Sequence, residues 1–440
     1  MKEVSSRITI ALVATILAIG TSFLFFPGLM SFDSIFLYRQ VIGDMPVNNY
    51  HPPVMVYMWQ MGHLLLGPGA MLIFQQLVYW TSITIIAVHA HDRLWARSLL
   101  VVILGLLPPL WIHSATIWND TGVMVSLLLA IACTLLLKRT GSRWVFVIGF
   151  LALCYAQAVK QTALFAAIPL FYILCDAYFN SGQRHGRWPE TVKLATALLT
   201  VSVSVTLMLS SIGVEKYTKW PTIAVWDLSA VSMAEQKVLI PTAVLYDKSA
   251  SGHETLDRIE EVFNPKVNGT LGDVVMFFPE PEYRAELLEA WLALPLDYPG
   301  HYLAHRARVF SHVLGIGSDD IHLAFESRII ANDQGLKLVN QDSKTLNAAI
   351  QWLALSTQTV IFRPWFYLVV LILIFTLALY RLWQNNSFGP RLLVCMGLSG
   401  LLYVSPLLII APAADFRYNL WMVACAAVMM CLMLFRGIKT

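Results

Sequence analysis

Side chains able to move protons first occur shortly after the opening apolar run of the chain. Asp33 stands beside Ser34, and the same stretch contains Arg39, Asp44 and His51-Pro52-Pro53. A carboxylate at the edge of an apolar segment can accept a proton from a hydroxyl nucleophile, so Asp33 is a candidate general base. The alternative is that Asp33 and Ser34 only cap the helix that follows.

Two later clusters supply a second carboxylate and a cation. The sequence Trp118-Asn119-Asp120 follows His113 in one short polar stretch, and Lys160-Gln161 stands in another. Asp120 either contacts a substrate or caps the helix behind it. Lys160 needs an anionic partner, which is either an aspartate or a ligand phosphate.

The fourth cluster is Asp415-Phe416-Arg417-Tyr418. Arg417 is suited to bidentate phosphate binding, unless it pairs locally with Asp415. Two carboxylates and two cations could let a hydroxyl attack a substrate whose leaving group is a phosphate. One carboxylate would act as base, and the cations would stabilise the departing charge. The sequence has no glycine-rich phosphate loop, HExxH motif or cysteine metal pattern, so neither nucleotide binding nor a dedicated metal site is predicted.

The composition indicates that these clusters lie in a membrane protein. The chain has 440 residues, of which 57% are apolar and 13% charged, whereas an ordinary globular domain has roughly 25% charged residues. Such a chain has too few polar side chains to cover a water-facing surface, which excludes a cytosolic enzyme. The net charge of +3 is too small to indicate nucleic-acid binding. The six cysteines lie in apolar runs, as small buried side chains do.

Apolar runs that can cross a bilayer need about 20 residues, and ten candidates occur. We therefore predict an all-α polytopic membrane protein with about ten transmembrane helices. The runs are 8–27, 69–89, 98–113, 121–137, 144–159, 163–179, 194–212, 364–380, 392–411 and 418–435. The shorter run 53–66 begins at a Pro-Pro pair and ends at Gly-Pro-Gly, and it is predicted to be an interfacial helix on the outer leaflet.

Basic residues near the ends of these runs set the orientation. With the N-terminus inside, fourteen lie on the cytoplasmic side and three on the outer side. The cytoplasmic set is Lys2, Arg7, Arg93, Arg97, Lys138, Arg139, Arg143, Arg184, Arg187, Lys193, Arg381, Arg391, Arg436 and Lys439, and the outer set is Arg39, Lys160 and Arg417. We predict that both termini are cytoplasmic and that the four polar clusters face outward.

The predicted organisation has three parts. Residues 1–212 form an N-terminal transmembrane module of seven helices with an outer loop at 28–68, and residues 364–440 contain the last three helices. Between them, residues 213–363 contain polar sequence with helical amphipathic periodicity. This middle part is predicted to be a mainly helical periplasmic domain.

The order of these motifs resembles that of the C-type (GT-C) glycosyltransferases, integral membrane enzymes that use polyprenyl- or dolichyl-phosphate-linked sugars. Members carry an acidic residue just after the first membrane helix, where Asp33 stands. His51-Pro52-Pro53 looks like the Lys-Pro-Pro of the lipid A aminoarabinose transferases. Trp118-Asn119-Asp120 is similar to a Trp-Lys-Asp pattern, with Asn119 in place of the lysine. Asp415-Phe416-Arg417-Tyr418 resembles the acidic-x-Arg-Tyr signature before the last helix.

This resemblance implies an inverting glycosyltransferase of the bacterial inner membrane with its active site facing the periplasm. The donor would be a polyprenyl-phosphate-linked sugar, and the acceptor a hydroxyl of a glycan or glycolipid such as lipopolysaccharide O-antigen or lipid A. Asp33 would be the base, Asp120 would orient the acceptor or a metal, and Lys160, Arg417 and Tyr418 would hold the lipid phosphate. The other substrate-binding candidates are Arg39, Asp44, His51, Trp118, Asn119 and Gln161. We expect no obligatory metal, although some relatives need a divalent ion.

Two alternatives remain open. An O-antigen polymerase or ligase also uses lipid-linked substrates, and it would place key arginines in the large outer segment, where Arg306 and Arg308 are the candidates. A transporter or flippase for a lipid-linked saccharide would also need outward-facing cations. The missing internal inverted repeat argues against transport.

Overall fold

The computed structural model describes residues 2–181, 188–211, 214–317 and 320–434. Within these ranges the chain is helical and forms only isolated β-bridges, with no strand. The predicted all-α fold is therefore confirmed. Arg184, Arg187, Arg436 and Lys439, on which part of the predicted orientation rests, lie outside the described residues.

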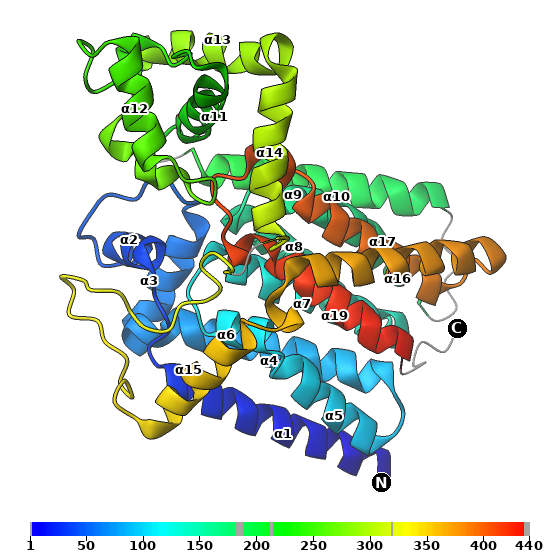
Figure 1. Ribbon diagram of the computed structural model, residues 1–440. Coiled ribbons are helices and arrows are strands. Elements are labelled where there is room, and N and C mark those ends of the chain that lie inside the picture. The colour runs from blue at the N-terminus through cyan, green and yellow to red at the C-terminus, as the bar shows by residue number, and fades with distance from the viewer. Residues whose placement is uncertain (1, 182–187, 212–213, 318–319, 435–440) are drawn as a thin grey trace. The chain divides into compact units, whose positions relative to one another are not determined.

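All ten predicted apolar runs are helical over most of their length (Figure 1). They correspond to α1 Lys2–Phe25, α4 Ala70–Ala90, α5 Leu94–Gly105 with α6 Pro108–Ser114, α7 Asn119–Thr140, α8 Arg143–Val159, α9 Ala163–Phe179, α10 Trp188–Leu209, α16 Pro364–Gln384, α17 Phe388–Val404 with α18 Leu407–Ile410, and α19 Leu420–Leu434. In the described part of the chain, seven helical segments are long and apolar enough to cross a membrane, or eight if α5 and α6 form one bent crossing. The chain is a multi-pass membrane protein, and the number of ten crossings stays a prediction.

The third predicted run is broken rather than straight. Its two halves, α5 and α6, are bent by 68°, and the break comes directly before Pro108-Pro109. Proline lacks the N–H that a continuing helix requires and keeps the residue before it out of the helical region. The backbone of Leu107 is accordingly extended, with ψ of 116°. After this bend, α6 ends at Ser114, four residues before Trp118.

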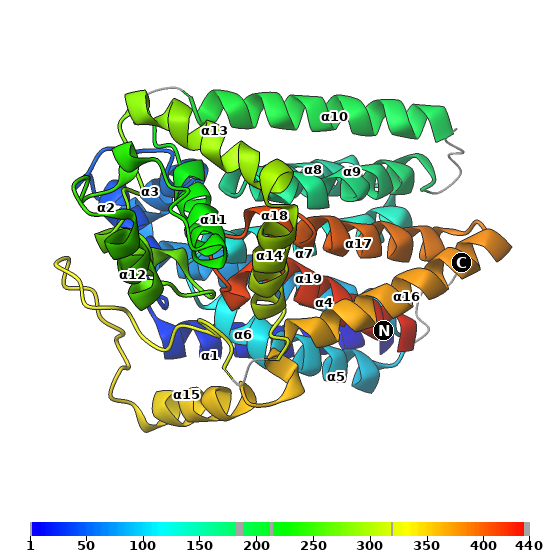
Figure 2. The same cartoon turned by 45° about the horizontal axis from the view of Figure 1, so that its top comes forward.

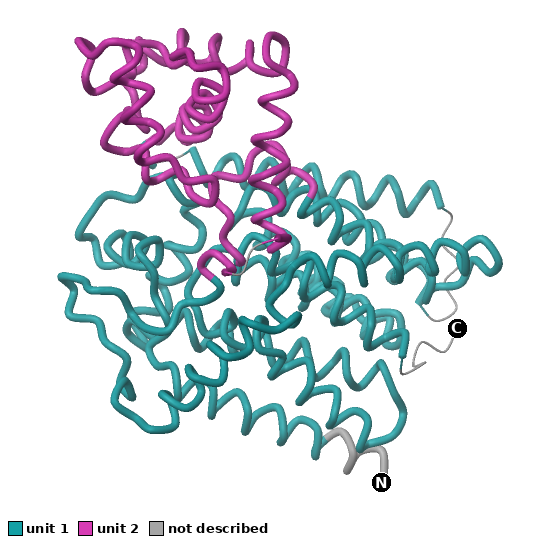
Figure 3. Tube along the Cα trace, in the orientation of Figure 1, with its two compact units in different colours: residues 1–215, 324–404, 417–440 teal, residues 216–323, 405–416 magenta. Residues whose placement is uncertain are grey.

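The chain forms two compact units (Figure 3). The first contains residues 1–215, 324–404 and 417–440, and the second contains residues 216–323 and 405–416. Residues 324–363, predicted within the outer segment, thus belong to the first unit. Their backbone explains this, because the Ile330 N–H donates to Met30 O at 3.0 Å and the Val339 N–H donates to Phe26 O at 3.0 Å.

In the first unit the long helices lie side by side, and α7 is almost completely buried. Figures 1 and 2 show α2 Phe32–Val41, α3 Val54–Leu66 and α15 Lys344–Ser356 near the end of the bundle where α1 finishes. The run predicted to be interfacial is thus a helix of its own, α3, and the short 3-10 turn η1 Gly67–Gly69 separates it from α4. Its position on the outer leaflet stays a prediction.

The second unit is helical as well. It contains α11 Trp220–Glu235, α12 Gly252–Val262, α13 Pro281–Asp297, α14 Pro299–Val313 and α18, with the short 3-10 turns η2 Thr242–Val244 and η3 Asn268–Asp273. Its helices pack around buried side chains of α11, α13 and α14. Two further 3-10 turns, η4 Val360–Phe362 and η5 Phe416–Asn419, precede α16 and α19.

Two of the loops of the first unit, after α1 and after α6, are joined by their backbones. The Leu29 N–H donates to Ala115 O at 2.9 Å, and the Ile117 N–H donates to Leu29 O at 2.9 Å. The turn into this contact needs Gly28, whose φ is +122° and whose missing Cβ would lie 2.7 Å from the Ile117 side chain. The side chains that follow Leu29 and Ile117 in the sequence are therefore held close to one another.

We expect Gly28→Ala to lower the free energy of unfolding by about 1–3 kcal/mol, because alanine is strained at this φ and its methyl group would crowd Ile117. Gly43→Ala is the matched control, since Gly43 also has a positive φ, +77°, but open space around it. Thermal unfolding of the purified protein in detergent measures both. Equal losses in the two variants would show that the contact with Ile117 contributes nothing.

Candidate functional site

Asp33 lies in the first turn of α2 and does not cap it. The N-cap is Ser31, and Ser34 Oγ accepts a hydrogen bond from the Ser31 N–H at 3.1 Å. Ser34 Oγ also donates to Ile117 O at 2.7 Å, which fixes this turn to the loop between α6 and α7. The Asp33 carboxylate is therefore available for other partners.

Those partners are Arg417 and His51. Arg417 Nη1 lies 2.5 Å from Asp33 Oδ2, and His51 Nε2 lies 3.5 Å from Asp33 Oδ1. The side chains are only 21% exposed for Asp33 and 15% for Arg417. Three segments far apart in sequence thus meet at one largely buried carboxylate.

Aromatic rings support the guanidinium of Arg417. Its Cζ lies 4.9 Å from the centroid of the Trp118 ring and 5.4 Å from that of Tyr418. Trp118 is itself held in place, because its Nε1 donates to Ser31 Oγ at 2.7 Å. Rings in this position stabilise a cation and restrict its movement.

A second ion pair lies beside the first. Lys160 Nζ donates to Asp120 Oδ1, and the Tyr403 hydroxyl donates to the same oxygen at 3.3 Å. Lys160 Nζ also lies 4.7 Å from the centroid of the Tyr418 ring. Tyr418 therefore contacts both cations, and the two ion pairs form one cluster.

The electrostatics of the cluster keep Asp33 ionised. Burial alone would raise the pKa of Asp33, but the charge of Arg417 and the contact with His51 outweigh it and hold that pKa well below its ordinary value. Burial, together with the charge of Asp33, raises the pKa of the nearby Tyr50 hydroxyl. The two carboxylates and two cations balance each other, so the cluster is close to neutral without a ligand.

The structure brings together most of the residues predicted for the site. The residues in the cluster are Asp33, His51, Trp118, Asp120, Lys160, Arg417 and Tyr418. Arg39 and Asp44 instead form an exposed ion pair of their own at 2.9 Å. The Gln161 side chain is exposed.

Asn119 has a positioning role that its sequence motif does not indicate. Its Nδ2 donates to Val159 O at 2.6 Å, and this contact fixes the end of α8 to the start of α7. Lys160 directly follows Val159, and Asp120 directly follows Asn119. The amide therefore sets the spacing of the second ion pair.

Tyr403 is the member of the cluster that the sequence analysis did not find. It lies in the apolar run that forms α17 and is 2% exposed. A tyrosine in an apolar run is usually packed like any other ring, so only its contact with Asp120 distinguishes it. The sequence carries no signal for that contact.

Metal ligation is a separate question. Among the residues that the structure describes, no group of three or more His, Cys, Asp or Glu side chains could hold a metal ion. Asp33 and Asp120 each contact a cationic side chain instead.

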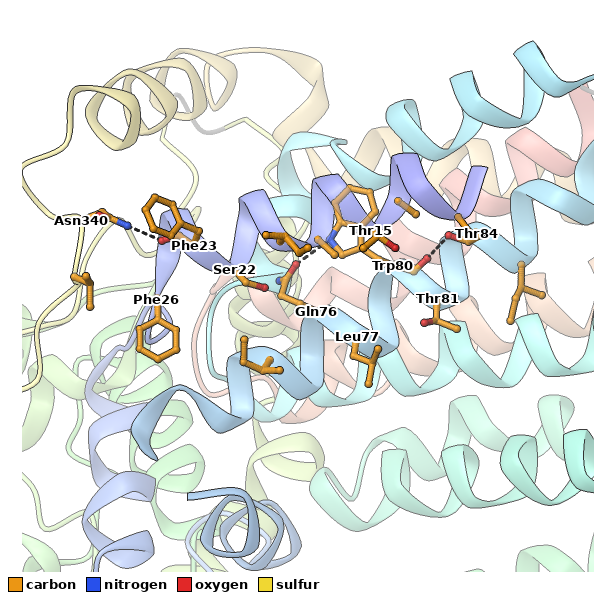
Figure 4. Close-up of a pocket in the computed structure, with 17 residues that line it drawn as sticks. Thr15, Ser22, Phe23, Phe26, Gln76, Leu77, Trp80, Thr81, Thr84 and Asn340 are labelled. Carbon is orange, nitrogen blue, oxygen red and sulfur yellow. Dashed lines mark hydrogen bonds between the residues drawn. The ribbon is translucent and has the colours of Figure 1, made fainter. Parts of the chain in front are cut away.

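An apolar cavity of about 700 Å³ lies elsewhere in the first unit, along α1 and α4 (Figure 4). Its polar lining groups are largely engaged, since Trp80 Nε1 donates to Gln76 Oε1 and Asn340 Nδ2 donates to Phe23 O. None of its lining residues is charged. This cavity suits a hydrocarbon chain and cannot replace the ion-paired cluster as a phosphate site.

Comparison with known proteins gives a likeness to solved structures alone. No family model matches the chain, and no curated protein matches it. Among solved structures, the chain is similar to ArnT from Cupriavidus metallidurans bound to undecaprenyl phosphate, with 12% sequence identity and a TM-score of 0.34, over 96% of this chain and 77% of that one. What this chain does must follow from its own residues.

Because Asp33 has a depressed pKa, its ion pair should stabilise the fold over the whole neutral range. The stability it supplies is present above the unfolded pKa, about 3.9, and is lost only as the pH falls below that value. We expect Asp33→Asn to lower the free energy of unfolding by about 1–3 kcal/mol. The deficit should not shrink between pH 8 and pH 5.

Thermal unfolding of wild type and Asp33→Asn across that pH range tests this expectation. Asp247→Asn is the control, since Asp247 forms an exposed pair with Arg258 at 3.0 Å and exposed pairs contribute little. A deficit that shrinks as the pH falls to 5 would contradict the depressed pKa of Asp33.

Proposed function

We propose that this protein is an inverting GT-C glycosyltransferase. It moves a sugar from a polyprenyl-phosphate donor to a hydroxyl of a glycan or glycolipid on the outer face of the bacterial inner membrane, and both termini are cytoplasmic. The observation that carries this proposal is the cluster of two ion pairs on the ring of Tyr418. It combines a base with two phosphate ligands in one largely buried place.

The two cations suit a lipid phosphate. Arg417 offers a planar guanidinium for two parallel hydrogen bonds, and Lys160 adds a point charge that also contacts Tyr418. In the structure each cation is neutralised by a carboxylate. A donor phosphate competes with Asp33 for Arg417 and with Asp120 for Lys160, and the enzyme therefore binds an anionic donor in preference to a neutral one.

Asp33 then acts on the acceptor. Once Arg417 binds the phosphate, the Asp33 carboxylate takes the proton of the acceptor hydroxyl while that oxygen bonds to the anomeric carbon. The bond from this carbon to the phosphate oxygen breaks, and the phosphate leaves with the electron pair. Lys160 and Arg417 stabilise its added charge. A single in-line displacement inverts the anomeric carbon.

Three other residues hold these groups. His51 keeps contact with Asp33, Trp118 supports Arg417, and Asp120 orients Lys160 or the acceptor. The proposed acceptor is a periplasmic glycan or glycolipid such as lipopolysaccharide O-antigen or lipid A.

The alternatives fit the contacts less well. A ligase would use Arg306 and Arg308, but Arg306 is 2% exposed and bound to Asp227, which leaves only Arg308 accessible. A flippase needs cations to guide its cargo but no base beside them. Asp33 placed between His51 and Arg417 favours chemistry over transport.

We expect Asp33→Asn to reduce sugar transfer by at least about a hundredfold, because loss of a positioned general base costs that much. Binding of polyprenyl phosphate should persist. Transfer is measured with a radiolabelled polyprenyl-phosphate sugar and acceptor extracts in detergent, with Asp247→Asn as the matched control. Near-normal turnover in Asp33→Asn would remove Asp33 from the mechanism.

We expect Arg417→Gln to weaken binding of polyprenyl phosphate by about 10- to 100-fold, the contribution of hydrogen bonds from a charged group. Isothermal titration of the purified protein with polyprenyl phosphate measures this affinity. Arg258→Gln, in the exposed pair with Asp247, controls for the general loss of positive charge. An unchanged affinity in Arg417→Gln would show that the phosphate binds elsewhere.

A further inference from the structure

The side of α2 that carries Asp33 also carries Phe36 and Gln40. These three positions follow one another at i, i+3 and i+7, and residues with this spacing lie along one side of a helix. Asp33 contacts His51, in the loop that follows α2. Phe36 and Gln40 contact the same loop, in residues 48–51. The loop therefore folds back along the helix that bears the proposed base.

Gln40 and Asn48 hold one end of this loop through a buried contact. Asn48 is fully buried, and Gln40 almost so. Gln40 Nε2 donates to Phe36 O at 3.3 Å, and Gln40 Oε1 accepts from the Asn48 N–H at 3.0 Å. Burying an amide is costly unless hydrogen bonds compensate it. Here the bond to the helix backbone orients the Gln40 side chain, and the oriented side chain holds the loop.

The Asn48 side chain fixes the residues that come next. Its Oδ1 accepts from the Tyr50 N–H at 3.1 Å. A hydrogen bond from an asparagine side chain to the backbone two residues on forms an Asx-turn. This turn sets the direction of the chain at Tyr50. Because His51 directly follows Tyr50, the turn also sets the direction in which the imidazole leaves the backbone.

Three aromatic rings continue the contact from the turn to Asp33. The centroid of Phe36 lies 5.4 Å from that of Tyr50 and 6.2 Å from that of His51, and the last two centroids are 5.0 Å apart. Edge-to-face packing of this kind favours particular ring orientations. At the end of the row, His51 Nε2 lies 3.5 Å from Asp33 Oδ1.

We propose that Asn48 is a positioning residue for His51: its side chain sets the turn that holds the imidazole against the Asp33 carboxylate. The proposal rests on the proposed function in that it takes Asp33 to be the general base. The hydrogen bonds of the Asn48 side chain go to Tyr50 and Pro46. It therefore acts through the backbone before His51. All of these residues belong to the first unit.

A fixed His51 matters because Asp33 has to lose its other contact. In the structure the carboxylate contacts both Arg417 and His51, and in the proposed reaction Arg417 turns to the donor phosphate. His51 then keeps the carboxylate directed at the acceptor, as a base must lie within hydrogen-bond reach of the proton it takes. If His51 is loose, transfer slows, although Arg417 and Lys160 still bind the phosphate.

Asn48→Ala removes the side-chain acceptor and tests positioning without a substrate. Diethyl pyrocarbonate modifies accessible imidazoles, and mass spectrometry measures the rate at each histidine. The His51 side chain is only 15% exposed. We expect its modification to become about five- to tenfold faster in Asn48→Ala, the factor that one hydrogen bond contributes. His253, whose side chain is 87% exposed, should react at the same rate in both proteins and serves as the internal control.

Asn48→Ser is the matched conservative variant, because a serine hydroxyl forms the same turn more weakly. Its rate of modification at His51 should lie between those of wild type and Asn48→Ala. If Asn48→Ala does not fold, Gln40→Met replaces it. This variant removes the acceptor for the Asn48 N–H and leaves the bond from Asn48 to Tyr50, so the rate at His51 should rise by about two- to threefold.

Transfer measurements separate positioning from a general loss of structure. We expect Asn48→Ala to lower sugar transfer about tenfold, since misplacing a group near the chemistry is costly. The affinity for polyprenyl phosphate, measured by isothermal titration, should change less than about twofold, because the phosphate ligands are not displaced. In a His51→Gln background, Asn48→Ala should change transfer less than about twofold, since residues that act through one another are not additive.

Two results would overturn the proposal. One is an unchanged rate of modification at His51 in folded Asn48→Ala or, if that variant does not fold, in Gln40→Met. The other is a loss of transfer of the same size with and without His51, because a merely structural role would add to the loss of the imidazole. If the wild type neither binds polyprenyl phosphate nor transfers sugar, the proposed function fails, and the modification rates alone decide whether Asn48 positions His51.

Discussion

The ion pair between Asp33 and Arg417 is the interaction on which the rest of the site depends. It joins residues 384 positions apart in a chain that has few charges. Either group alone, as little exposed as these are, would be costly at the edge of a membrane segment. In the pair, the charge of each group compensates the charge of the other. The protein can therefore keep a base and a phosphate ligand ready in a largely apolar setting before any substrate binds.

The pairing also imposes an order on the proposed reaction. Asp33 cannot accept a proton readily while Arg417 holds its pKa well below the ordinary value. When a phosphate takes the guanidinium, that restraint weakens and the carboxylate becomes more basic. In the proposed reaction the donor phosphate would thus activate the base, and water would meet an inactive carboxylate when no donor is present. In the proposed reaction a phosphate that takes Lys160 would release Asp120 in the same way.

The sequence predicts those features of this site that have a local cause. Hydropathy locates the helices, and the positive-inside rule places all four polar clusters on one side, which is why residues as distant as Asp33 and Arg417 were expected together. Which charged residue pairs with which is not determined by nearby sequence. Arg417 pairs with Asp33, although Asp415 is closer in sequence. Likewise, the hydrogen bond of Tyr403 to Asp120 and the backbone pairing of Ile330 with Met30 depend on contacts that no periodicity encodes.

Residues on both sides of the 405–416 segment contribute to the cluster of the first unit. Tyr403, which binds Asp120, ends the stretch before this segment, and Arg417 and Tyr418 begin the stretch after it. The segment itself is anchored in the second unit through Arg306 and Asp227. Both ion pairs of the cluster therefore have a member or a hydrogen-bond donor within a few residues of this anchor. Tyr403 and Arg417 therefore reach the cluster from opposite ends of one short stretch of chain.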